Sequence, residues 1–162
     1  MTTRTLTLSD ALTVITDMRE TDRACLGAML GEVSDEVFAA DRFQSTGPAW
    51  TLLDDDGAPM AVTGLNMPNA WSATAWLVAR RGLKAQSWRK LVRLARTVLA
   101  NAADAGHEQY RHRIEAHVLA SWSGARILAQ RLGFHYEGIR RGAGRRGEDI
   151  EVWAIVGPAK GD

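Results

Sequence analysis

The sequence contains a single cysteine, Cys25, among its 162 residues. One cysteine cannot form an internal disulfide or a cysteine metal cluster, so disulfide scaffolds and zinc fingers are excluded. Cys25 lies in an apolar helical pattern, which favours a buried structural thiol over a nucleophile. The remaining metal-binding candidates, His107, His112 and His135, have no convergent spacing with acids. We therefore expect no metal site.

Long apolar runs are missing as well. No stretch approaches the roughly 20 apolar residues that a membrane-spanning helix needs, and the first residues are too polar for a signal peptide. Repeats and low-complexity tracts are absent, which excludes a solenoid and a disordered chain. The length fits one domain covering residues 1–162. A cytoplasmic location is the default expectation.

Acidic residues are absent between Gly57 and Ala103, although seven cations fall within that span. Residues 1–79 carry four arginines against eleven acids, a net charge of −7, whereas residues 80–162 carry sixteen cations against eight acids, a net charge of +8. This asymmetry indicates an anionic partner for the start of the second half. The acidic first half suits a cationic partner.

Strand and helix patterns alternate along the chain. In the first half we expect strands at 5–8, 50–53, 59–65 and 72–79, and helices from Ser9 or Asp10 to Met18 and at 20–30. Asp54–Gly57 is a hairpin turn signal, and residues 32–47 have no clear assignment. In the second half we expect helices at 85–103 and 123–132 and strands at 112–119, 134–140 and 150–156. A mixed sheet with helices on both faces accommodates this order.

The segment from Ala125 to Arg140, ARILAQRLGFHYEGIR, carries a family resemblance. Leu128 and Leu132 can pack the helix on a sheet, and Gly133 allows a left-handed exit before the next strand. Together with the order of elements, this segment resembles the GNAT superfamily of N-acyltransferases. The resemblance implies an α/β (α+β) fold with a mixed, mostly antiparallel sheet of about six to seven strands and about four helices.

A second resemblance is carried by Asp17–Arg23, by Trp50 and by Trp76-Leu77-Val78. These residues are similar to a GNAT-like group encoded by tailed bacteriophages and prophages. It implies a phage or prophage origin and allows a virion-associated location.

The GNAT resemblance implies acetyl-CoA or another acyl-CoA as co-substrate. In that family a splayed strand binds the pantetheine arm and the next helix start binds the pyrophosphate, which suits free amides at a positive helix end. The implied cofactor-binding residues are Leu77, Val78, Ala79, Arg80, Arg81, Lys84, Ala85, Gln86, Ser87, Trp122 and Arg126. The family's glycine-rich phosphate loop is missing, because Gly82 is the single glycine from Arg80 to Ser87.

The family's usual catalytic Asn and Tyr are also missing, since Trp122 and Ala129 occupy their places. The candidate catalytic residues are Ser123 and Tyr136, as donors to the leaving sulfur, and Glu115, which with His117 could activate an amine. Each has a structural alternative. Ser123 fits a helix N-cap, and Glu115 and His117 fit a salt-bridged strand face.

Two tryptophans at loop edges, Trp71 and Trp122, are candidates for lining a substrate pocket. The other four are expected in the core: Trp50, Trp76, Trp88 and Trp153.

Three functions are compatible with these patterns. The first is acyl-CoA-dependent N-acyltransfer to a small-molecule or protein amine. The second is a catalytically degenerate GNAT-like protein that serves as a binding or virion-associated component. The third, nucleic-acid binding, is the least favoured, because basic residues alone support only non-specific affinity. It would use two clusters: Arg89, Lys90, Arg93 and Arg96, and Arg140, Arg141, Arg145 and Arg146. An exposed sheet edge at 150–156 would permit a homodimer.

Overall fold

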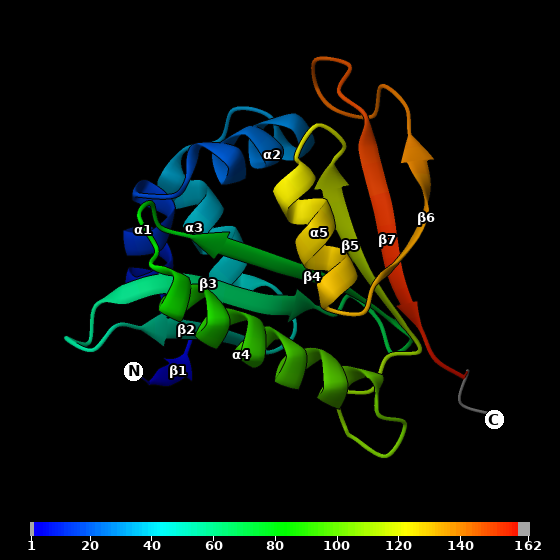
Figure 1. The fold of residues 1–162 in the computed structure, drawn as a ribbon, viewed down its shortest axis with the longest axis horizontal. Helices are drawn as coiled ribbons and strands as arrows, with labels where there is room; N and C mark the ends of the chain where they lie inside the picture. Colours follow the sequence, from blue (N-terminus) through cyan, green and yellow to red (C-terminus); the bar gives the residue numbers. More distant parts are fainter. Residues whose placement is uncertain (1, 159–162) are drawn as a thin grey trace.

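The computed structural model describes residues 2–158. A seven-stranded sheet in the order β1-β2-β3-β4-β5-β7-β6 forms the centre. Helices α1, α2 and α3 lie on one face of the sheet, and α4 and α5 lie on the other (Figure 1). The predicted α/β class and the mixed sheet with helices on both faces are confirmed.

The elements follow one another with short connections. In chain order they are β1 (Thr3–Thr5), α1 (Leu8–Thr16), α2 (Glu20–Leu30), α3 (Asp35–Gln44), β2 (Ala49–Leu53), β3 (Pro59–Asn66), β4 (Ser72–Ala79), α4 (Ala85–Ala103), β5 (Arg113–Leu119), α5 (Ser123–Arg131), β6 (His135–Arg140) and β7 (Ile150–Val156). Among the described residues, no helix is both long and apolar enough to cross a membrane.

The N-terminal boundaries differ from the prediction. The strand ends at Thr5, and the Thr7 side chain accepts a hydrogen bond from the Asp10 N–H, so that Leu8 already begins α1. A fifth helix, α3, occupies the stretch without an assignment, where the Ser34 hydroxyl caps the Val37 N–H. The apolar Val37 is 58% exposed, so the apolar residues of α3 do not form one buried stripe.

The C-terminal strands cross in an order that the sequence does not reveal. β7 pairs antiparallel with β5 on one side and with β6 on the other. The predicted exposed edge at 150–156 is therefore wrong, because both sides of β7 carry ladder bonds. The edge strand at this end of the sheet is β6.

The neighbouring strands β4 and β5 are parallel and separate along their length. Their pairing is limited to Ser72↔Arg113, Ala73↔Ile114 and Thr74↔Glu115. Beyond these three pairs the strands diverge (Figure 1), while β4 stays paired with β3 up to Ala79. The sheet thus has an internal gap between residues 75–79 and 116–119.

Two apolar layers hold the helices on either side of this gap. On one face, Val14 and Ile15 of α1 and Phe38 of α3 pack against Val62 and Val78. On the other face, α4 packs on the sheet through Leu91, Val98 and Leu99. The sheet positions both layers, and the gap lies between them.

Candidate functional site

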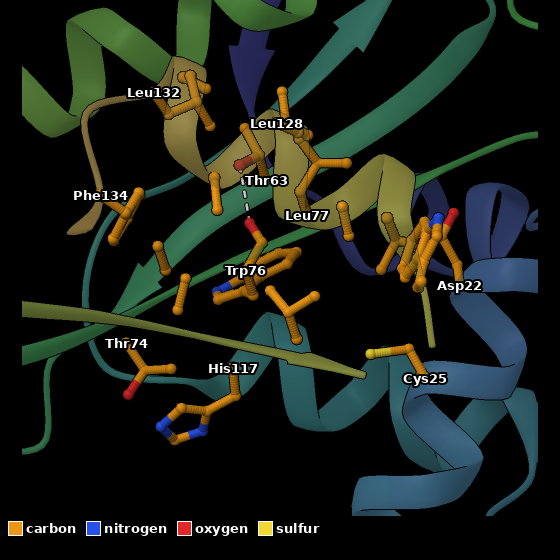
Figure 2. Close-up of a pocket in the computed structure, with 18 of the residues that line it drawn as sticks. Asp22, Cys25, Thr63, Thr74, Trp76, Leu77, His117, Leu128, Leu132 and Phe134 are labelled. Atoms are coloured by element: carbon orange, nitrogen blue, oxygen red, sulfur yellow. Dashed lines mark hydrogen bonds between the residues drawn. The ribbon is translucent and has the colours of Figure 1, made fainter. Parts of the chain in front are cut away.

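A cavity of about 1040 Å³ occupies the gap and continues through the sheet to both faces. On the α4 and α5 face it is lined by Leu77, Val118 and Leu128, and on the opposite face by Cys25 and His117. Figure 2 shows Leu128 and Leu132 on one side of Trp76, with Cys25 and His117 on the other. This volume is at the upper end for small-molecule sites.

Backbone groups of both strands face the gap. The Arg113 N–H donates to the Trp71 C=O at 3.2 Å, so the backbone N–H and C=O groups of the odd-numbered residues of β5 face β4. By the same alternation, Leu77 on β4 and His117 on β5 point their N–H and C=O groups into the gap, where no strand lies opposite. An extended ligand can bond to such groups like an added strand.

The far end of β4 is already occupied. The Ala79 N–H donates to the Asp22 carboxylate at 3.4 Å, and the Ala79 C=O accepts from the Arg19 N–H at 3.1 Å. The next residue, Arg80, forms an isolated β-bridge with Met18. The chain around Arg19 and Asp22 therefore occupies the backbone groups of Ala79 that a ligand could otherwise bind. The N–H and C=O of Leu77 stay available to a ligand.

The Arg19 side chain closes the gap beyond Leu77. Its guanidinium donates to Asp22 at 2.7 and 3.0 Å and lies 4.5 Å from the Trp88 ring centroid and 5.3 Å from that of Trp122. Burial raises the pKa of Asp22, and the hydrogen bonds from Arg19 and from the Ala79 N–H oppose that rise. A cation between two indoles and a buried carboxylate is well stabilised.

The structure places some of the predicted cofactor-binding residues at the cavity and others outside its lining. Leu77, Val78 and Trp122 line the cavity. Ala79 borders it, with its backbone groups bonded to Asp22 and Arg19.

Three predicted cations lie outside the cavity lining and have acidic partners. Arg80 pairs with Asp17 at 2.9 Å, and Arg81 lies 3.6 Å from the same carboxylate. Arg126 pairs with the buried Glu151 at 3.1 Å. Arg80 and Arg126 are thus paired within the protein, whereas the exposed Arg81 is only loosely paired.

The start of α4 also lies outside the cavity lining. Lys84 is its N-cap and makes no side-chain capping bond. Ala85, Gln86 and Ser87 form the first turn, in which Ser87 is buried.

Glu115 and His117 form a hydrogen-bonded chain at the cavity. His117 Nε2 lies 2.9 Å from Glu115 Oε2, and Arg113 Nε donates to Glu115 Oε1 at 2.6 Å. Arg113 also binds Glu137. Burial acts to raise the pKa of Glu115, but the hydrogen bonds from Arg113 and His117 outweigh it, so that the pKa lies below its ordinary value. The carboxylate is ionised and orients the imidazole that lines the cavity.

The other two predicted catalytic residues lie away from the cavity lining. Ser123 is exposed and is the first residue of α5; the N-cap is Trp122, so the predicted capping role of Ser123 is wrong. Tyr136 is 51% exposed and packs edge-on against Trp153 at 5.5 Å. The structure therefore brings Glu115 together with His117 but not with Ser123 or Tyr136.

Several lining residues were not predicted as site residues. Trp76 and Trp88, expected in the core, line the cavity, whereas Trp71 is 58% exposed and lies outside the lining. Trp76 Nε1 is buried and has no hydrogen-bond partner among the described residues.

Two further lining residues come from α2 and α3. Cys25 is buried as predicted but also lines the cavity, and burial raises the pKa of its thiol. The Arg42 guanidinium lies 5.4 Å from the Trp76 ring centroid. No sequence pattern indicated that Arg42 lines a cavity, because the stretch that contains it was not assigned to a helix or strand. In the described part of the chain, no cluster of three or more His, Cys, Asp or Glu is placed to hold a metal ion.

Solved structures of N-acetyltransferases share this fold. A mutant of the spermidine N-acetyltransferase of Vibrio cholerae superposes with a TM-score of 0.69 at 16% identity, over 96% of this chain and 95% of that one. The ribosomal-protein-S5-alanine acetyltransferase of Vibrio fischeri gives 0.70 at 14% identity, over 99% and 94%. The ribosomal-protein-S18-alanine N-acetyltransferase of Escherichia coli gives 0.67 at 19% identity, over 99% and 96%.

Sequence comparison adds no relative: no family model and no curated protein matches the chain. At these identities the structural likeness establishes the fold. The chain has the GNAT fold that the sequence resemblance implied.

Proposed function

We propose that the chain is an acyl-CoA-dependent N-acyltransferase that moves an acyl group, such as acetyl, to an amine by direct attack in a ternary complex. The observation that carries this proposal is the gap after Thr74, which opens a cavity through the sheet. A pantetheine arm can bond to Leu77 as an added strand, and an amine can approach from the face of His117. The same fold serves N-acetyltransferases whose names specify spermidine and protein alanine.

The chemistry assigned to the cavity is simple acyl transfer. The amine nitrogen attacks the thioester carbonyl carbon, and the C–S bond then breaks. His117 accepts the proton that the amine loses, and that proton neutralises the departing thiolate, so CoA leaves as a free thiol. The Leu77 N–H faces the gap and can donate to the developing oxyanion.

Glu115 acts as a positioning residue for this base. Its carboxylate accepts from His117 Nε2–H, so that Nδ1 is the nitrogen left to take a proton. The negative charge of Glu115 stabilises the imidazolium that forms, and Arg113 holds the carboxylate in place.

The charge of the cavity lining limits which amine can accept the acyl group. Asp22 is the one acid among the described lining residues, and it is already bonded to Arg19. The acidic residues of the first half, expected to suit a cationic partner, mostly pair with arginines instead, as Asp17 and Asp35 do. An amine of low positive charge therefore suits this cavity better than a polyamine.

Release of free thiol from acetyl-CoA tests the proposal. The protein would be incubated with acetyl-CoA and a panel of free amino acids, peptides with free N-termini, lysine-containing peptides and spermidine, with mass spectrometry of each product. We expect amine-dependent thiol release and a product heavier by one acetyl group. Absence of turnover with every amine, and with propionyl- and longer acyl-CoA donors, would contradict it.

A second candidate is a GNAT-fold protein that binds a ligand without chemistry. It is favoured by the occupied backbone of Ala79 and by Trp122 and Ala129 at the family's usual catalytic places. Thermal stabilisation by CoA without any turnover would support it. A phage or prophage origin and a cytoplasmic or virion location remain predictions from the sequence. The homodimer loses the edge at 150–156 on which its prediction rested, because β7 is paired on both sides.

A further inference from the structure

Three arginines form a row along the exposed side of α4. Arg89, Arg93 and Arg96 are spaced by four and three residues, which places them on one side of the helix. All three are exposed and line the cavity, as does Arg131 of α5. The row spans about 10 Å of helix. We call the space between this row and α5 the arginine groove.

Among the described residues, the charges of the arginine groove have no acidic partner. Within residues 2–158, none of these four arginines forms an ion pair with an acid, and Arg96 instead donates to the Arg131 C=O at 3.1 Å. Arg80 and Arg126, by contrast, pair with Asp17 and Glu151. Unpaired like charges beside an apolar cavity attract a multiply charged anion.

On the other route for such an anion, toward the start of α4, the backbone at the end of β4 is already bonded. A ligand reaching the first turn of α4 from the gap would pass Ala79, whose N–H is bonded to Asp22. It would then reach the Arg19 guanidinium near Trp88 and Trp122, whose charge is already paired with Asp22. The cavity also extends to Val92 of α4 and Leu128 of α5, and the arginines of the groove, unpaired among the described residues, belong to its lining.

We propose that the phosphates of the acyl-CoA lie in the arginine groove, against Arg89, Arg93 and Arg131, and not on the free amides at the start of α4. This inference rests on the proposed function. The thioester and the pantetheine arm fill the apolar cavity, and the pyrophosphate and ribose phosphate meet the row of guanidinium groups. The absent glycine-rich loop is then not needed, because side chains replace backbone amides as phosphate ligands.

Three double variants separate the two routes. Arg89→Gln/Arg93→Gln removes two charges from the arginine groove, and Arg81→Gln/Lys84→Gln removes two charges near the start of α4. Lys90→Gln/Arg141→Gln removes two charges that line neither place and is the matched control. Binding of CoA and of pantetheine, which lacks the phosphates, would be measured by calorimetry at low and high salt.

The groove variant is expected to bind CoA at least about tenfold more weakly, with a shallower salt dependence, and to bind pantetheine as the wild type does. The control variant keeps the wild-type affinity for CoA. Loss of CoA affinity in Arg81→Gln/Lys84→Gln, with none in the groove variant, would overturn the inference and leave the proposed function intact. Wild-type binding of CoA without turnover would overturn the function, while the same variants would still decide where the phosphates lie. A wild type that binds no CoA at millimolar concentration overturns both.

Discussion

The Arg19 guanidinium holds the Asp22 carboxylate against the end of β4. Two hydrogen bonds of 2.7 and 3.0 Å join the side chains, and the same carboxylate accepts from the Ala79 N–H. The Asp22 side chain is 3% exposed, whereas that of Arg19 is 24% exposed between Trp88 and Trp122. This pair fixes the connection between α1 and α2 at the point where the gap would otherwise open further.

Removal of Arg19 is expected to leave a buried carboxylate without its cation. Arg19→Met should lower the free energy of unfolding by about 2 kcal/mol at neutral pH. The double variant Arg19→Met/Asp22→Asn should recover at least half of that loss, because an amide needs no counterion. Urea unfolding of both variants measures the difference. Equal stability of the single and the double variant would contradict the coupling between the two residues.

The pH dependence of stability should carry the signature of Asp22. Burial raises its pKa above the ordinary value of 3.8. The contribution of Asp22 is therefore fully present below that value and is lost as the pH rises through the folded-state pKa. Asp22→Asn should match the wild type at about pH 3.8 and be more stable than the wild type at neutral pH, as measured by urea unfolding across this range. If the stability of the wild type relative to Asp22→Asn instead rose with pH, the hydrogen bonds from Arg19 would outweigh the effect of burial on the Asp22 pKa.

The sequence predicted most elements because their signals are local. The apolar stripe of α4, the Asp54–Gly57 turn and Gly133 after α5 each act within a few residues. Helix α3, which was not predicted from the sequence, has a local cap at Ser34. Its apolar Val37 and Phe43 are exposed, so its apolar residues show no helical periodicity. The place of β7 between β5 and β6 depends on pairing between distant segments, which no local pattern specifies.

The candidate site was predictable only in part for the same reason. Leu77 and His117 follow from strand alternation, and both line the cavity. The closure at Ala79 depends on Asp22, which lies 57 residues earlier in the chain. Arg80 and Arg81 were expected to face phosphate because their stretch lacks acids, yet acids from the α1–α2 connection reach them in space. Charge counts along a sequence do not register such pairing.

Gly64 of β3 lies under the Trp76 ring, and its substitution should be costly. A Cβ there would lie 2.7 Å from the Pro48 C=O oxygen and 2.9 Å from Trp76 Cζ2. Gly64→Ala should therefore lower the free energy of unfolding by about 1–3 kcal/mol. Gly27→Ala is the control, because it lies in α2 with open space around it and should raise stability by about 0.5–1 kcal/mol. Thermal and urea unfolding compare the two, and an unchanged Gly64→Ala would refute the close packing.

His117 and Glu115 are expected to affect acyl transfer in different ways. His117→Gln removes the proposed base and should lower kcat/KM for the amine by about 100-fold, while CoA affinity changes little. Glu115→Gln keeps the shape but loses the charge that stabilises the imidazolium, so its loss should be smaller, about tenfold, and its pH–rate profile should shift to lower pH. Steady-state kinetics over a range of pH distinguishes the two roles.

A salt-bridged strand face without a catalytic role would give a different result. In that case Glu115→Gln would lower stability, because Arg113 loses a 2.6 Å partner, and both variants would retain the wild-type pH–rate profile. Arg113→Gln is the matched control, since it disturbs the same cluster while both Glu115 and His117 remain. An Arg113→Gln variant that loses as much kcat/KM as His117→Gln would show that the cluster acts through packing, and the assignment of His117 as the base would then fail.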